Sequence, residues 1–166
     1  MKTKNIICTL FFFALFLGSQ KTLSQITAGA GLAFGTNVNT AGITVNGQYF
    51  INEKWAIAPD FIYYFPRSGG NGFNLNWYEI NANGNYYFVD GGVTKFYGLA
   101  GLNLSIVSIP SLGFAGVGSS ASNLGFNLGG GADFDISSSI TPFAQLKYTL
   151  SSFNQLVITA GVRYTF

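Results

Sequence analysis

Apolar and polar residues alternate with a period of two along most of the chain after residue 24. Successive side chains of a β-strand point to opposite faces, so this period indicates strands with one apolar and one polar face. In the last segment an apolar residue occupies every second position up to Phe166. The pattern predicts an all-β chain with strands at 25–34, 43–51, 55–65, 75–89, 94–106, 123–136, 140–150 and 155–166.

The predicted connections alternate between short turns and longer joins. Three are short and rich in turn-forming residues, namely 52–54, 90–92 and 137–139. The others are longer, at 35–42, 66–74 and 110–122, with a shorter one near 151–154. Short turns at one end, longer loops at the other and an even number of strands are typical of an antiparallel up-and-down barrel that spans a bilayer.

Two prolines, Pro59 and Pro142, fall inside predicted strands. Proline has no backbone N–H and therefore cannot donate to the hydrogen-bond ladder of a sheet. We expect a bulge or weak pairing at both positions.

Alternation alone leaves two architectures open, because an apolar face can point into a soluble β-sandwich or outward to lipid. The aromatic residues favour the second. One band lies near the predicted short turns and the C-terminus and contains Tyr49, Trp55, Tyr86, Phe88, Phe96, Phe134, Tyr164 and Phe166. The other lies towards the opposite strand ends and contains Phe34, Tyr63, Phe65, Tyr78 and Tyr148. Two such bands are characteristic of the two interfaces of a membrane.

Composition agrees with a membrane barrel. Charged residues make up 8% of the chain, against about 25% in ordinary soluble domains. Aromatic residues reach 17%. No apolar run after residue 24 approaches 18 residues, so the sequence predicts no transmembrane helix in that part.

Residues 1–24 have the pattern of a secretory signal peptide, with Lys2 and Lys4 before an apolar run at 6–18 and a cleavage site between Ser24 and Gln25. The alternative is a membrane anchor, but the run has 13 residues, whereas a spanning helix needs about 20. Cleavage would remove three of the 8 basic residues and leave 5 against 6 acidic ones. The remaining chain has no basic cluster, which argues against nucleic-acid binding.

Over 25–166 the chain resembles the small eight-stranded outer-membrane barrels, namely the OmpA-like transmembrane domain and the porin-family outer-membrane β-barrel domains. The resemblance rests on the signal peptide, on the strand Tyr-Gly-Leu-Ala-Gly-Leu-Asn-Leu at 97–104 and on the ending Val-Arg-Tyr-Thr-Phe at 162–166. It implies a protein of the bacterial outer membrane that contacts outer-membrane lipid and has both termini in the periplasm. It also implies that Tyr164 and Phe166 form an assembly signal read by the barrel-assembly machinery.

The sequence gives little sign of catalysis. It contains no histidine, which excludes His-dependent metal sites and Ser-His triads. Asp133 and Asp135 could be interpreted as a metal clamp, but two successive inward positions near a barrel rim explain them better. We therefore expect a non-enzymatic protein without a cofactor or a metal.

The charged residues of the predicted strands fall on the polar, inward faces: Asp60, Glu79, Lys95, Asp133, Asp135, Lys147 and Arg163. An eight-stranded barrel is just wide enough for side chains to fill. We expect Arg163 and Lys147 to pair with Asp60, Asp133 or Glu79 and to help close the lumen. The alternative is that the same charges line a narrow, gated pore.

These observations favour a monomeric barrel with a structural or surface-interaction role. Its longer loops, including 67–74 and 111–122, would face outside, where Phe73 and Phe114 are candidates for contact with an unidentified extracellular ligand. One alternative function is a narrow small-solute pore. Another is a soluble barrel that carries a lipid, which would require an apolar interior.

Overall fold

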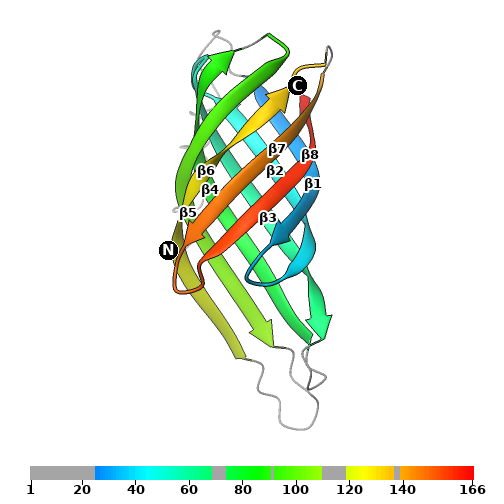
Figure 1. Cartoon of the computed structure of the whole chain (residues 1–166), viewed down its shortest axis with the longest axis vertical. Coiled ribbons are helices and arrows are strands. Elements are labelled where there is room, and N and C mark those ends of the chain that lie inside the picture. Colours follow the sequence, from blue (N-terminus) through cyan, green and yellow to red (C-terminus); the bar gives the residue numbers. More distant parts are fainter. Residues whose placement is uncertain (1–24, 69–73, 91, 110–118, 137–138) are drawn as a thin grey trace, which may run out of the picture.

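The computed structural model describes residues 25–68, 74–90, 92–109, 119–136 and 139–166 (Figure 1). Eight strands account for most of them: β1 (Ile26–Gly35), β2 (Thr40–Phe50), β3 (Trp55–Ser68), β4 (Asn74–Asp90), β5 (Thr94–Ile109), β6 (Ser119–Phe134), β7 (Ile140–Leu150) and β8 (Gln155–Thr165). In this part of the chain there is no helix long and apolar enough to cross a membrane.

The strands form one closed antiparallel sheet in which each strand pairs with its neighbours in the sequence. Pairing of β1 with β8, from Thr27 opposite Thr165 to Gly35 opposite Val157, closes the barrel. The predicted fold, an eight-stranded antiparallel up-and-down barrel, is confirmed. Figure 1 shows the C-terminus at the end where β4 meets β5 and β6 meets β7.

The two faces of the strands lie as the alternation predicts. On β8, Val157, Thr159 and Arg163 are buried inside the barrel, whereas Ile158 and Val162 are half exposed on its outer surface. The same division holds on β4, where Glu79 is inside and Ile80 is outside. The outer surface is therefore apolar and the interior largely polar, the reverse of a soluble protein.

Several strand bounds differ from the prediction. The longer join expected at 35–42 is a tight turn of residues 36–39, since β2 begins at Thr40. This turn is fixed to β8, because Thr36 N donates to Leu156 O (2.9 Å) and Leu156 N donates to Thr36 Oγ1 (3.0 Å). β6 begins at Ser119 instead of 123, because its first residues pair with the end of β5 although they show no alternation of large apolar and polar side chains.

The strands have unequal lengths, and the inequality lies at one end of the barrel. β3, β4, β5 and β6 project beyond the turns that join β1 to β2 and β7 to β8 (Figure 1). β6 pairs with β5 from Ser119 onwards, but its described pairing with β7 begins only at Phe126. A four-stranded extension therefore stands on one side of this opening.

Both prolines lie where pairing is incomplete, as predicted. The ladder between β2 and β3 has no pairs between Asn46–Asp60 and Tyr49–Ile57, the stretch that contains Pro59. The ladder between β6 and β7 ends at the pair of Asp133 with Phe143, one residue before Pro142.

Candidate functional site: the polar interior of the barrel

Buried polar side chains outnumber buried apolar ones among the described residues, and nearly all of the polar ones point into the lumen. They come from every strand except β3, because each strand contributes every second residue to the interior. A polar group shielded from water is costly unless it is hydrogen-bonded. The interior therefore depends on how completely these groups bind one another.

Two ion pairs span the lumen. Lys147 Nζ of β7 lies 3.3 Å from Asp60 Oδ1 of β3, and the lysine side chain is fully buried. Arg163 Nη1 of β8 lies 2.5 Å from Asp133 Oδ1 of β6. Each pair joins strands that are not neighbours in the sheet: β3 and β7 stand on opposite sides of the barrel, whereas β6 and β8 are separated only by β7.

Further side chains form hydrogen bonds with the members of both ion pairs. Asp60 accepts hydrogen bonds from Asn81 (2.7 Å) and Asn83 (2.8 Å). Asp133 also accepts from Tyr87 Oη (2.7 Å), and Arg163 Nε donates to Asn46 Oδ1 (2.9 Å).

An aromatic ring also contacts the guanidinium of Arg163, whose Cζ lies 3.8 Å from the centre of the Phe143 ring. Buried ion pairs are tolerated when their remaining hydrogen-bonding capacity is met in this way.

A cluster of amide side chains from β4, β5 and β6 lies next to the Asp60–Lys147 pair. Asn127 Nδ2 donates to Asn81 Oδ1 (2.8 Å) and Asn83 Oδ1 (2.9 Å). Asn103 Nδ2 donates to the same Asn81 oxygen (2.8 Å), and Thr149 Oγ1 donates to Asn127 Oδ1 (2.8 Å). Sequence reasoning missed this cluster as a site, although the asparagines at every second position of β4 are its signal.

Glu79 differs from the other buried charged residues. It is fully buried, and Tyr64 Oη (3.3 Å) and Gln155 Nε2 both donate to its Oε1. No lysine or arginine of the described residues lies within ion-pair distance, so the expected pairing of Lys147 is with Asp60 and not with Glu79.

Apolar groups close the lumen at two levels. Towards the extension lie Ala33, Ile62, Tyr64 and Val157, with Val38 and Trp77 packed against them. Towards the other end lie Ala56, Tyr87, Tyr97 and Leu99, with Phe50 against them. The Asp60–Lys147 pair and its amide partners lie between these two clusters, whereas Asp133 and Arg163 also line the cavity that opens at one end.

Glycines on the inner faces make room for the largest of these side chains. The ring and hydroxyl of Tyr97 occupy the space where a Cβ of Gly131 would stand. Arg163 Cγ likewise would lie 2.7 Å from a Cβ at Gly29. Both glycines are the cross-strand neighbours of the residues they accommodate, so Tyr97 and Arg163 can lean over the adjacent strand because no side chain stands there.

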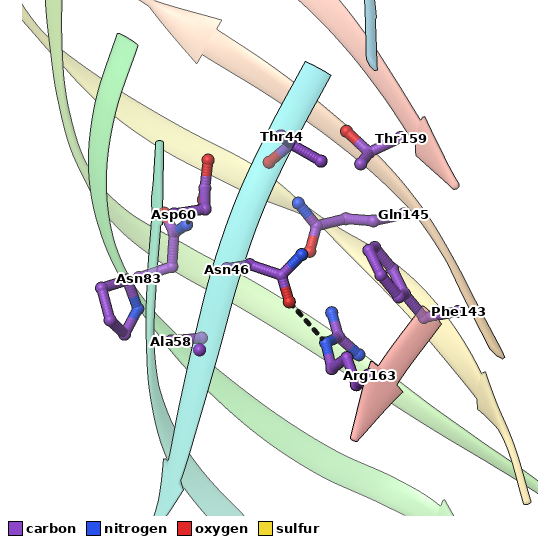
Figure 2. A pocket seen from close by; sticks show the side chains of 11 residues that line it. Thr44, Asn46, Ala58, Asp60, Asn83, Phe143, Gln145, Thr159 and Arg163 are labelled. Atoms are coloured by element: carbon purple, nitrogen blue, oxygen red, sulfur yellow. Dashed lines mark hydrogen bonds between the residues drawn. The ribbon is translucent and has the colours of Figure 1, made fainter. Parts of the chain in front are cut away.

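The described part of the barrel also contains cavities. A cavity of about 780 Å³ opens at the short-turn end, which is the end of the barrel that holds the C-terminus. Its lining includes Lys95, Asp133, Asp135 and Arg163. Lys95 and Asp135, both expected in the lumen, are partly exposed at this mouth and pair at 3.7 Å, because each lies within one residue of a strand end. The second cavity measures about 10 Å³ and lies deeper, beside Asp60 and Arg163 (Figure 2).

The last two aromatic residues lie on the outer surface. The rings of Tyr164 and Phe166 meet edge to face with centroids 5.1 Å apart, and both are exposed. The candidate partner residues Phe73 and Phe114 lie outside the described residues.

Known structures share this fold. The chain is similar to Ail of Yersinia pestis in complex with the heparin analogue sucrose octasulfate (16% identity, TM-score 0.66, covering 87% of this chain and 100% of that chain). It is also similar to Neisserial surface protein A (20% identity, TM-score 0.64, covering 86% of this chain and 96% of that chain). A third match is the N-terminal β-barrel domain of Pseudomonas aeruginosa OprF (17% identity, TM-score 0.64, covering 89% of this chain and 100% of that chain). At these identities the likeness establishes the fold, which is that of the eight-stranded outer-membrane barrels.

No protein-family model matches the chain, and no curated protein matches its sequence.

Replacing Arg163 with leucine should leave Asp133 buried without its cation. Loss of one partner of a buried pair costs about 3–5 kcal/mol, so the urea midpoint of unfolding in detergent should fall strongly. R163K, which keeps the charge, should lose less, and the double variant R163L/D133N should recover part of the loss. Equal stability of R163L and the wild type would show that the pair does not support the barrel.

Replacing Gly131 with alanine should displace the Tyr97 ring, because the new methyl group needs the space that the ring fills. Overpacking of this kind costs about 1–3 kcal/mol. The matched control is G84A, whose Cβ would be 3.8 Å from its nearest neighbour. The shift of G131A relative to G84A in urea unfolding measures the effect, and Y97L in the G131A background should reduce it.

Proposed function

We propose that this chain is an integral β-barrel of the bacterial outer membrane with a structural or surface-interaction role and a lumen filled by side chains. The observation that carries the proposal is the inversion of the two faces. Large apolar residues such as Leu102, Phe126 and Leu128 are more than half exposed on the outer wall, while lysine, arginine and carboxylates are buried inside. Exposing this apolar outer surface to water would cost free energy, whereas contact with lipid is favourable.

The same inversion argues against a soluble lipid carrier. Such a barrel needs an apolar interior, whereas the two cavities given above have charged residues in their linings. The pore alternative has less support than the filled lumen, because Tyr64, Tyr97 and the Asp60–Lys147 pair are almost fully buried across the interior. The geometry also contains no nucleophile and base arranged for catalysis among the residues described above.

Residues 1–24 are in this proposal a signal peptide that is removed on export. Both termini then lie in the periplasm, at the end with the short turns. Tyr164 and Phe166 would be read by the barrel-assembly machinery while their side chains face lipid, and the mature barrel would be monomeric. Their exposure on the outer surface supports this reading, since a recognition signal must be accessible.

The two ends of the barrel differ in how many charged residues they carry. Glu53, Lys54, Lys95 and Asp135 line the mouth at the short turns. Among the described residues of the opposite end, at 36–39, 66–68, 74–76, 106–109, 119–122 and 151–154, Arg67 is the single charged one. An extracellular partner would therefore be recognised by hydrogen bonds and aromatic contact and not by strong electrostatic attraction.

A described aromatic pair is available at this end. The rings of Trp77 and Phe153 meet edge to face at 6.0 Å, and Phe153 is half exposed beside the four-stranded extension. Ail was solved with a polyanionic sulfated sugar, but the single cation here does not favour that chemistry for this chain. We propose an uncharged partner, such as a neutral glycan.

Replacing Leu102 with arginine tests the membrane assignment. Leu102 lies midway along β5 on the outer face, where an arginine facing lipid costs about 2–4 kcal/mol. L102R should fold poorly into lipid vesicles, seen as loss of the fast-migrating band in an unboiled gel. A control, S152R, places the same charge on an exposed turn and should fold normally. Normal folding of L102R would contradict the lipid-facing assignment.

The surface role is tested with bacteria that display the barrel. Their binding to immobilised neutral glycans should fall in F153A but not in F88A, which removes an exposed ring at the other end. Binding should also persist in 0.5 M salt, where the Debye length is only about 4 Å. Binding that salt abolishes would contradict an uncharged contact, and clear conductance in planar bilayers would favour the pore.

A further inference from the structure

Acidic and basic side chains do not balance inside the described part of the barrel. Three acidic and two basic ones are buried or almost buried there: Asp60, Glu79, Asp133, Lys147 and Arg163. Asp60 pairs with Lys147 at 3.3 Å. Asp133 pairs with Arg163 at 2.5 Å. Glu79 is the acid that remains, and it is fully buried without a described lysine or arginine at ion-pair distance.

Only one of the two Glu79 oxygens has hydrogen-bond partners. Tyr64 Oη and Gln155 Nε2 both donate to Oε1. The other oxygen, Oε2, is buried without a partner among the described residues, and so is Oε1 of Gln155. In the register of the sheet Glu79 lies opposite Ile62 of β3 and Ser105 of β5, neither of which carries a charge. The carboxyl group therefore sits at the apolar cluster towards the extension, to which Ile62 and Tyr64 belong.

A proton on Glu79 explains both unpaired oxygens. An ionised carboxylate only accepts hydrogen bonds, whereas a protonated carboxyl group also has an O–H donor. The amide of Gln155 likewise has both a donor and an acceptor. Its Nε2 already donates to Glu79 Oε1. With a proton on Oε2, Glu79 gains the donor that the Gln155 oxygen lacks, so the two side chains become complementary.

The charges around Glu79 act on it in opposite directions. They belong to Lys147 and Asp60, which bind each other. Tyr64, the titratable neighbour on β3, is an uncharged hydrogen-bond donor. Burial of an unpaired ionised carboxylate is so costly that such a group takes up a proton instead.

We propose that Glu79 is a proton-binding site and that the folded barrel holds it as a neutral acid at neutral pH. The proton takes the place that a basic side chain has beside Asp60 and beside Asp133. The proposal rests on the filled lumen proposed above, because water in an open pore would solvate the ionised form. Loss of the proton in alkaline solution would leave an unpaired charge beside Ile62 and Tyr64 and would loosen the extension end of the lumen first.

The variant E79Q tests the proposal through the pH dependence of stability, because glutamine keeps the shape of the side chain but does not titrate. In the unfolded chain a glutamate releases its proton near about pH 4.3. Above that pH the folded barrel holds one proton more than the unfolded chain, so the stability of the wild type falls as the pH rises. The unfolding equilibrium constant of the wild type relative to E79Q, from urea unfolding in detergent, should therefore rise by up to about tenfold per pH unit.

D133N is the matched control, because it also replaces a buried carboxylate by an amide but leaves a cation, Arg163, without its partner. Its urea midpoint should lie below that of the wild type at every pH between about 5 and about 8, whereas the midpoint of E79Q should not. A wild-type to E79Q ratio that is independent of pH in this range would overturn the proton site. That outcome would leave the filled lumen intact, which the conductance measurement tests separately.

The wild-type chain also provides a direct test, which requires no variant to fold. Glu53 and Glu79 are the only glutamates of the sequence, and Glu53 is exposed at a short turn. With ¹³C in the side-chain carboxyl group of glutamate, NMR of the barrel in detergent should show Glu53 titrating near about pH 4.3. The Glu79 signal, assigned by its loss in E79Q, should have the shift of a protonated acid at neutral pH. Two glutamate signals that both titrate as Glu53 does would contradict the proposal.

Discussion

Closure of the sheet between β1 and β8 is the constraint on which the rest of the structure depends. A closed barrel has no edge strand, so backbone N–H and C=O groups find partners along the sheet. With eight strands the closed sheet leaves an interior only as wide as a few side chains. Every inward residue must then either pack against its neighbours or leave space for them, as Gly131 does for Tyr97 on the adjacent strand.

The narrow interior determines how charge is handled. Asp60 and Lys147, like Asp133 and Arg163, come from strands that do not pair with each other, yet they meet because the lumen is narrow. Such pairs stabilise a structure little on their own, since burial of the charges is costly. Their hydrogen bonds to Asn81, Asn83 and Asn46 offset that cost.

The two ends of the barrel differ in charge and in strand length. Among the described residues, the short-turn end holds most of the accessible charge around an open mouth, whereas the other end has a single charged residue and carries the extension of β3 to β6. The proposed recognition of an uncharged partner rests on the aromatic and hydrogen-bonding residues at that end.

The sequence by itself determined the strands, their faces and their number, because a period of two is a local property that closure turns into inside and outside. It also placed Lys147 and Arg163 inside, since lipid would penalise them. Only the tertiary structure decided which carboxylate each one meets, and that Glu79 binds Tyr64 and Gln155. These contacts join residues up to 87 positions apart, and their geometry depends on the stagger of the whole barrel, which no single strand encodes.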